Sequence, residues 1–214
     1  MADPDAPAPR TKGRPTLDQA EQIDHAIREA AMQVMRDQDE PATLNAVAKV
    51  AGLSRKSLYA RYPTKAALFL AVIRDVLTAA EPLTFARGAS FPESLHNYIT
   101  AALDAIAGPG AQAIQRLMLL NPDYIATLRT EMPAAMRNIF AGPLRHLLQD
   151  AIAAGEIILT DEDLTVESIM KLIVVRDMDG IDSHLPADSR DWTARQANFL
   201  TGFICRGLVP PTAD

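Results

Sequence analysis

The sequence has almost no cysteine, since Cys205 is the only one in 214 residues. A single thiol can build neither a disulfide framework nor a cysteine metal cluster, so a reducing interior is the expected environment. The sequence also lacks any apolar run near the roughly 20 residues that cross a bilayer. Its start, MADPDAPAP, lacks the apolar stretch of a signal peptide. We therefore expect a soluble, cytoplasmic protein with no membrane partner.

Catalytic and metal-binding motifs are missing as well. The four histidines are scattered, and neither an HExxH pair nor a glycine-rich phosphate loop occurs. Cys205 has no neighbouring histidine in the sequence, and acids at 161–163 complement the dipole at a helix start. We expect no metal site, no cofactor and no enzymatic activity. An enzyme whose groups converge only in space stays an alternative, and His146 is either an effector contact or part of a polar helix face.

Carboxylates are absent from one stretch of an otherwise acidic chain, whose formal net charge is -6. Between Glu40 and Asp75 there is no Asp or Glu, and the cations in this window are Lys49, Arg55, Lys56, Arg61, Lys65 and Arg74. Such segregation of charge predicts an anionic partner for the first third of the chain. A solvated helix face is the alternative if charge is the only clue.

Alternating patterns typical of strands are almost absent, and apolar residues recur at spacings of three and four nearly everywhere. This periodicity predicts an all-α fold, and no internal repeat is visible. Proline and glycine predict a break or kink near Gly142 and Pro143. The predicted helices cover residues 17–37, 44–51, 55–62, 64–80, 91–107, 111–120, 122–130, 133–154, 161–177 and 189–207.

The second and third predicted helices have the proportions of a helix-turn-helix. Thr43 is a good N-cap for the second helix, Gly52 suits the left-handed conformation that closes it, and Ser54 can cap the third. Pro63 ends the third helix because proline restricts the residue before it. In a helix-turn-helix the second helix enters the major groove of DNA. Phosphate binding is driven by counterion release, which explains gathered cations and missing carboxylates.

The segment TLNAVAKVAGLSRKSLYARYPTKAAL resembles the N-terminal signature of the TetR family of bacterial transcriptional regulators. It has a capped helix, an A-x-x-A-G turn, an LY pair in the recognition helix, an aromatic residue and a lysine that opens the next helix. The resemblance covers about residues 16–70. It implies an N-terminal three-helix helix-turn-helix DNA-binding domain and a C-terminal helical ligand-binding and dimerisation domain. We expect a flexible basic arm at 1–15, the DNA-binding domain at 16–63, and the regulatory and dimerisation domain at 64–214.

The resemblance assigns phosphate contacts to four residues. Thr43 would use its hydroxyl and the helix N-terminus, and Ser57 stands where the family often has a threonine that touches phosphate. Tyr59 matches the phosphate-binding tyrosine of the family, and Lys65 matches the lysine that reaches the DNA backbone from the start of the fourth helix. These contacts would position the protein without reading sequence.

Three positions depart from the family pattern, where Lys56 replaces a frequent glycine, Ala60 a tyrosine and Arg61 a histidine. Base preference is therefore expected to differ from that of other members. Because Lys or Arg to guanine is the commonest specific base contact, we predict that Lys56 reads bases, with Arg55 and Arg61 as further candidates.

The stretch RTKGR resembles basic arms that enter the neighbouring minor groove. Arg10, Lys12 and Arg14 would gain there from the negative potential of the groove. The alternative interpretation is a solubilising tail.

The last two predicted helices resemble the dimerisation bundle of the family, and two-fold dimers bind half-sites about 34–36 Å apart or a multiple of that. Their apolar stripes either form the dimer interface or pack inside one subunit. The predicted interface residues are Val166, Ile169, Ile173, Trp192, Phe199 and Phe203.

The resemblance also implies a ligand cavity in the second half of the chain. Methionines are frequent there and adapt to apolar ligands, although a methionine at helical spacing can equally be core. An apolar or aromatic effector would fit such a site. The predicted lining residues are Leu103, Met118, Tyr124, Met132, Met136, Phe140, Met170 and Val174.

Together these features predict a homodimeric regulator of double-stranded DNA, in the simplest case a repressor that a small apolar or aromatic ligand releases from a palindromic operator. The effector is unidentified, and activation instead of repression is open. A helical adaptor that binds only protein would explain the apolar stripes but not the carboxylate-free window.

The basic arm is tested by deletion of residues 1–14. The truncated protein should bind its operator more weakly and with a flatter dependence on salt, because fewer counterions are released. Equilibrium binding at several salt concentrations measures both. Unchanged affinity and slope would show that the arm does not bind DNA.

Overall fold

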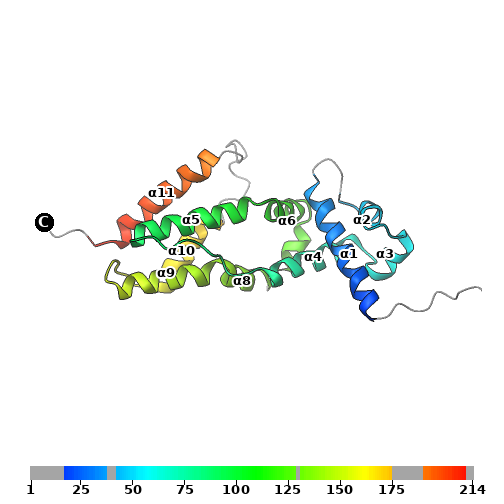
Figure 1. The fold of residues 1–214 in the computed structure, drawn as a ribbon, viewed down its shortest axis with the longest axis horizontal. Helices are drawn as coiled ribbons and strands as arrows, with labels where there is room; N and C mark the ends of the chain where they lie inside the picture. The colour runs from blue at the N-terminus through cyan, green and yellow to red at the C-terminus, as the bar shows by residue number, and fades with distance from the viewer. Residues whose placement is uncertain (1–16, 38–41, 129–130, 175–189, 211–214) are drawn as a thin grey trace, which may run out of the picture.

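The computed structural model describes residues 17–37, 42–128, 131–174 and 190–210. Within these ranges the chain forms helices and no strand, which confirms the all-α prediction. Figure 1 shows an elongated arrangement with α1 to α3 at one end and α9 to α11 toward the other. In chain order the elements are α1 (Leu17–Arg36), α2 (Leu44–Val50), α3 (Arg55–Arg61), α4 (Lys65–Ala79), α5 (Phe91–Ala107), α6 (Pro109–Leu120), α7 (Pro122–Thr127), α8 (Glu131–Met136), the π-helix η1 (Arg137–Ala141), α9 (Gly142–Ala153), α10 (Glu162–Val174) and α11 (Arg190–Leu208).

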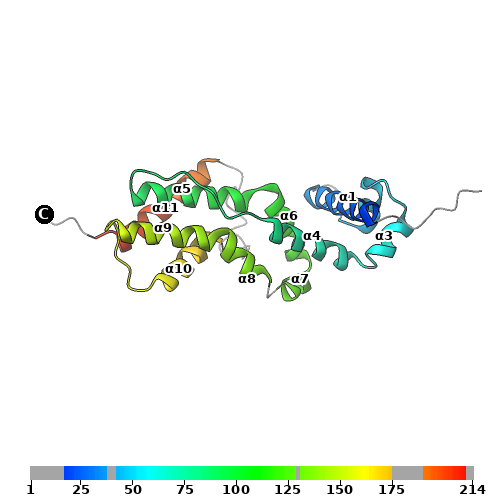
Figure 2. The same cartoon turned by 60° about the horizontal axis from the view of Figure 1, so that its bottom comes forward.

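Buried apolar side chains form two clusters. The N-terminal cluster joins α1 to α4 with α6 and α7, and includes Ile27, Leu58, Phe69 and Leu117. The C-terminal cluster joins α5, η1, α9, α10 and α11, which packs along α5. Figure 2 shows α4 running between the two ends of the molecule. Buried side chains on both sides of residue 63 belong to the N-terminal cluster. The predicted domain boundary at this residue therefore stays a prediction.

Local capping explains where α5 and α6 begin. Ser90 Oγ accepts a hydrogen bond from the amide of Glu93 at 3.5 Å, and the Glu93 carboxylate accepts one from the amide of Ala89 at 2.7 Å. The first bond satisfies an amide donor that an isolated helix start leaves unpaired, and the second ties the residue before the cap to the first turn of the helix. Pro109 opens α6 two residues earlier than predicted, because the first helical position needs no amide hydrogen.

The predicted break in the long helix is present as the π-helix η1, which separates α8 from α9. Pro143 has no amide hydrogen to donate to the carbonyl of Ile139. That carbonyl accepts a hydrogen bond from the amide of Leu83 at 2.8 Å. The next carbonyl, that of Phe140, accepts one from the Tyr98 hydroxyl at 3.1 Å. η1 is therefore tied both to α5 and to the segment that links α4 with α5.

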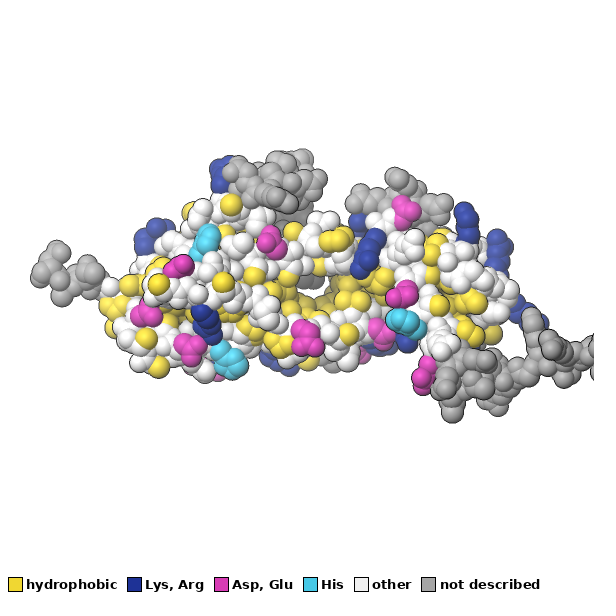
Figure 3. Space-filling model, in the orientation of Figure 1, with side chains coloured by type: hydrophobic (Ala, Val, Ile, Leu, Met, Phe, Trp, Pro, Cys, Tyr) yellow, Lys and Arg dark blue, Asp and Glu magenta, His cyan; other side chains and the backbone are white. Residues whose placement is uncertain are grey.

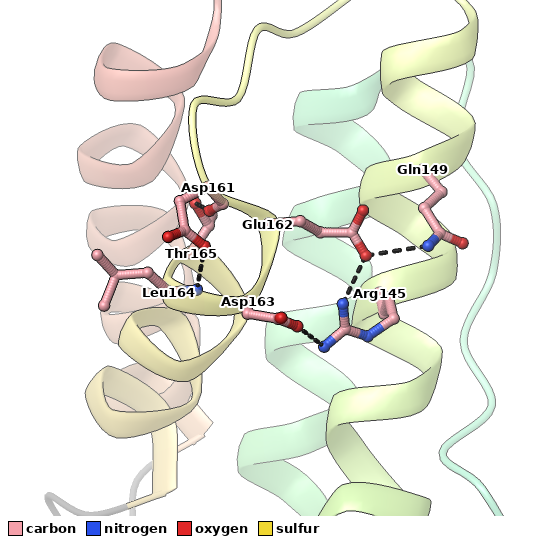
Figure 4. A network of polar contacts seen from close by, with 7 residues as sticks. All are labelled: Arg145, Gln149, Asp161, Glu162, Asp163, Leu164 and Thr165. Carbon is pink, nitrogen blue, oxygen red and sulfur yellow. Dashed lines mark hydrogen bonds and ion pairs between the residues drawn. The ribbon is translucent and has the colours of Figure 1, made fainter.

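The acids at the start of α10 have structural partners (Figure 4). Asp161 caps the helix by accepting from the amide three residues later at 2.9 Å. Arg145 of α9 donates to Glu162 and to Asp163, each at 2.6 Å, and Gln149 donates to Glu162 at 2.9 Å. Capping and ion pairing thus explain why acidic side chains stand at the start of α10. Within the described ranges no group of three or more His, Cys, Asp or Glu side chains could hold a metal ion.

The hydrogen bond to η1 is tested by Tyr98→Phe. Tyr98 is fully buried, and the variant keeps its ring beside Phe85 while removing the hydroxyl. We expect the free energy of unfolding to fall by about 1 kcal/mol, measured by urea denaturation. Tyr124→Phe is the matched control, because the buried Tyr124 makes no side-chain hydrogen bond with the residues described. Equal effects of the two variants would contradict a specific contribution from the bond to Phe140.

Candidate nucleic-acid interface

Two caps and one glycine set the geometry of α2 and α3. Thr43 Oγ1 and Ser54 Oγ each accept a hydrogen bond from the amide three residues later, both at 3.1 Å. Gly52 has a φ of +66°, in the left-handed region that side chains with a Cβ rarely adopt. The chain can therefore turn sharply between the two helices, as the sequence predicts.

The short helix α3 has one buried face. Leu58 is fully buried in the N-terminal cluster and anchors the helix. The residues around it are exposed, and Tyr59 is 45 % exposed although it is aromatic. Figure 3 shows Lys and Arg side chains at this end of the molecule. The exposed residues of α3 that were predicted to contact DNA are Arg55, Lys56, Ser57, Tyr59 and Ala60.

The other predicted contacts flank α3. Thr43 lies at the start of α2 and is half-buried, with its hydroxyl oxygen occupied as a cap acceptor. Its hydroxyl hydrogen can still donate to a phosphate oxygen. Lys65 is the first residue of α4, is exposed, and has its ammonium 5.8 Å from the centre of the Phe69 ring. Arg10, Lys12 and Arg14 lie outside the described residues.

Arg61 has a different environment from the rest of α3. Its guanidinium donates to Asp24 at 2.8 Å and to the carbonyl of Ala20 at 3.4 Å, both in α1. The neighbouring Tyr62 is half-buried; burial raises the pKa of its phenol, and the charge of Asp24 raises it further. A base contact by Arg61 would have to replace the ion pair that holds α3 against α1.

Two residues of α2 were missed at the sequence level. Asn45 and Lys49 are exposed and line a shallow groove of about 440 Å³ together with Thr43 and Arg55. Lys49 lies in the carboxylate-free window, which could have identified it. Asn45 gives no comparable signal. Both lie on the same surface as the predicted contacts.

The part of the chain that forms this surface matches a known family. Residues 27–72 match the family model described as bacterial regulatory proteins, tetR family. This range holds the whole of α2 and α3 with their caps. The chain is a DNA-binding transcriptional regulator whose DNA-binding domain matches the TetR family. No curated protein matches its sequence.

Several solved structures are similar in fold to this regulator over most of their length. A TetR transcriptional regulator from Agrobacterium tumefaciens is 20% identical, with a TM-score of 0.67 over 88% of this chain and 95% of that chain. The flavonoid-responsive regulator FrrA is 22% identical, with a TM-score of 0.53 over 90% and 100%. NalD from Pseudomonas aeruginosa, the secondary repressor of the MexAB-OprM multidrug efflux pump, is 18% identical, with a TM-score of 0.56 over 91% and 99%. At these identities the likeness shows the fold alone.

The predicted ligand-pocket residues of this regulator do not gather in one cluster. Val174 ends α10, and its side chain lies outside the described residues. Figure 3 shows a hollow with hydrophobic side chains around it, between the α5–α6 side and the α4–α8 side of the molecule. Members of the N-terminal cluster are Met118, Tyr124 and Met132, whereas the C-terminal cluster contains Leu103, Met136, Phe140 and Met170.

The predicted dimer residues of the regulator also divide into two groups. Val166, Ile169 and Ile173 are buried within the subunit, in the C-terminal cluster. By contrast, Phe199 is 66 % exposed and Phe203 53 % exposed, with their rings stacked at 6.2 Å between centres. Trp192 is half-buried.

Two further observations concern the alternatives to a DNA-binding regulator. Burial raises the pKa of the half-buried Cys205 thiol, which lowers its thiolate fraction and its reactivity. None of the helices in the described ranges combines the length and the hydropathy that a membrane span requires.

The ion pair between α3 and α1 is tested by a double-mutant cycle. Arg61→Gln and Asp24→Asn should each lower the free energy of unfolding by at most about 1 kcal/mol, because both side chains are partly exposed. The double variant should lose little more than either single variant, since both changes remove the same contact. Urea denaturation measures all four proteins. Strictly additive losses would show that the two residues are not coupled.

Proposed function

We propose that this TetR-family regulator is a homodimeric repressor that a small apolar or aromatic ligand releases from a palindromic operator. The observation that carries the DNA part is the surface of α3. It exposes Arg55, Lys56 and Tyr59 in a stretch of chain without a carboxylate, while Leu58 holds the helix in the core. Cations on such a surface displace counterions from phosphates, and no acid opposes them.

Each exposed residue has a distinct proposed role. Thr43, Ser57, Tyr59 and Lys65 hold phosphates on either side of the groove and fix the position of α3. Lys56, which is exposed in the first turn of α3, reads guanine, for which a lysine is a common partner. Asn45 and Lys49 of α2, which line the groove beside Thr43, extend the phosphate contacts. The arm residues Arg10, Lys12 and Arg14 enter the neighbouring minor groove.

A homodimer is proposed because α3 has only seven residues and can contact few base pairs. The stacked and exposed Phe199 and Phe203 of α11 are large apolar side chains of the kind that a second subunit would cover. They support the predicted interface on α11. Val166, Ile169 and Ile173 of α10 are packed in their own subunit and would support that interface from beneath.

The effector is proposed to bind in the regulatory half, where Leu103, Phe140 and Met170 belong to one apolar cluster. The hollow in Figure 3 and the relation in fold to a flavonoid-responsive regulator favour an apolar or aromatic molecule. The name of NalD as a repressor favours repression. Only different affinities for two conformations can release DNA, and a coupling of about 1 to 3 kcal/mol would lower DNA affinity about 5- to 150-fold.

α4 is the proposed path between ligand and DNA. It contributes Phe69 and Val72 to the core beneath α3, and Arg74 donates to Glu131 of α8 at 2.8 Å. A shift of α8 would therefore move α4 and change the separation of the two α3 helices in a dimer. Half-site spacing is what such a change would disturb.

The DNA-binding role is tested with genomic fragments that the full-length protein selects. Lys56→Ala should reduce discrimination between the selected fragments and random DNA by about 1 to 3 kcal/mol, because a base contact is lost. Tyr59→Phe should weaken binding to both kinds of DNA alike, because it removes a neutral phosphate contact. Fluorescence anisotropy at several salt concentrations measures both effects.

The matched control is Lys171→Ala, which removes a cation on α10 that pairs with Glu167 at 2.6 Å. It should leave the affinity unchanged. If Lys56→Ala and Tyr59→Phe behave like this control, α3 is not the DNA-reading helix.

A further inference from the structure

A second cleft lies outside the set of predicted ligand-pocket residues. It is a cleft of about 340 Å³ between the C-terminal half of α5, one face of α6 and the first turns of α11. Leu103 is the single residue that it shares with the predicted ligand-pocket residues. The volume is within the range of small-molecule sites.

One cation determines the charge of this cleft. Arg116 of α6 is half-buried in its wall, and no carboxylate is among the described residues that line it. Arg116 forms no ion pair and no side-chain hydrogen bond with any residue that the structure describes. An arginine presents its donors as a planar fork, which matches the two oxygens of a carboxylate.

The remaining wall combines an apolar floor with neutral polar groups. Leu103 and Ile106 of α5 are buried side chains that supply the apolar part, and Trp192 of α11 adds a half-buried aromatic ring. Gln112 and Gln196 face the cleft from α6 and α11 and can donate or accept hydrogen bonds without adding charge. Apolar walls with a few polar groups and one cation select the shape and the charge of a ligand.

We propose that this cleft binds a small aromatic molecule with one anionic group, in which Arg116 pairs with the anion and the ring lies among Leu103, Ile106 and Trp192. A neutral molecule of the same shape would leave the guanidinium partly desolvated without a partner. The site therefore distinguishes an aromatic anion from its uncharged analogue.

The position of α6 gives this site a direct connection to the DNA-binding end. Gln112, Arg116 and Leu119 lie on one side of the helix, whereas Ile114 and Leu117 are buried on the other side in the N-terminal cluster. α6 also lies close to α1, since a Cβ added at Gly110 would be 3.7 Å from Arg36 Nη2 and 3.9 Å from Met32 Cε. A ligand in the cleft thus contacts a helix that packs against the DNA-binding helices.

The test uses two fluorescent probes with the same ring system and the full-length protein. One is 1-anilinonaphthalene-8-sulfonate, which is an anion, and the other is uncharged N-phenyl-1-naphthylamine. Trp192 is the only tryptophan of the chain, so its emission reports a probe bound in the cleft. We expect the sulfonate to quench Trp192 and to bind about tenfold or more tightly than the amine, because a charge-assisted hydrogen bond is added.

Arg116→Gln should weaken sulfonate binding by about tenfold or more and leave amine binding unchanged. Arg116→Lys keeps the positive charge but lacks the planar fork of donors. Its affinity for the sulfonate should lie between those of the unaltered protein and of Arg116→Gln. The matched control is Arg195→Gln, which removes an exposed arginine of α11 that does not line the cleft. Thermal unfolding followed by circular dichroism shows whether each variant is folded. If Arg116→Gln is unfolded, the affinities of the two probes for the unaltered protein and for Arg116→Lys test the proposal instead.

Equal affinities for the two probes, an Arg116→Gln protein that binds the sulfonate as Arg195→Gln does, or unquenched Trp192 would each overturn the proposal. The DNA-binding test with Lys56→Ala does not depend on any of these results. Failure at the cleft and failure of the proposed repressor function are therefore separate outcomes.

Discussion

The burial of α6 between the two ends of the molecule is the contact on which the arrangement depends. Ala113, Ile114, Leu117 and Met118 complete the core of α1 and α4, so the DNA-binding helices do not close a core by themselves. Removal of apolar surface from water stabilises this joint without directional bonds. Such packing favours a small number of discrete arrangements over continuous deformation, which suits the proposed change between two conformations.

The features of the DNA-binding end that follow from local chemistry could be predicted from the sequence. Thr43 and Ser54 cap α2 and α3 as expected, and Gly52 adopts the left-handed conformation that the turn requires. These outcomes depend on residues within four positions of one another. The partner of Arg61 could not be predicted in this way, because Asp24 lies 37 residues earlier in the chain and meets it only after α1 and α3 pack.

In the C-terminal half, less could be predicted from the sequence. Met118, Tyr124 and Phe140 are buried and Met170 is half-buried, but apolar periodicity does not say which core a residue enters. The structure assigns them to two clusters. The cleft around Arg116 was missed because glutamines and an arginine on a helix read as an ordinary solvated face. Only the approach of α11 turns that face into the wall of a site.

The hydrogen bond between the Leu83 amide and the Ile139 carbonyl has a consequence for how this protein tolerates change over evolution. Donor and acceptor both belong to the main chain, so the side chains at these two positions can vary without breaking it. Proline at 83 is the exception, since it has no amide hydrogen. The attachment of the segment between α4 and α5 to η1 thus depends on the backbone conformation and not on particular side chains. Related proteins can keep this attachment while the sequence around it changes.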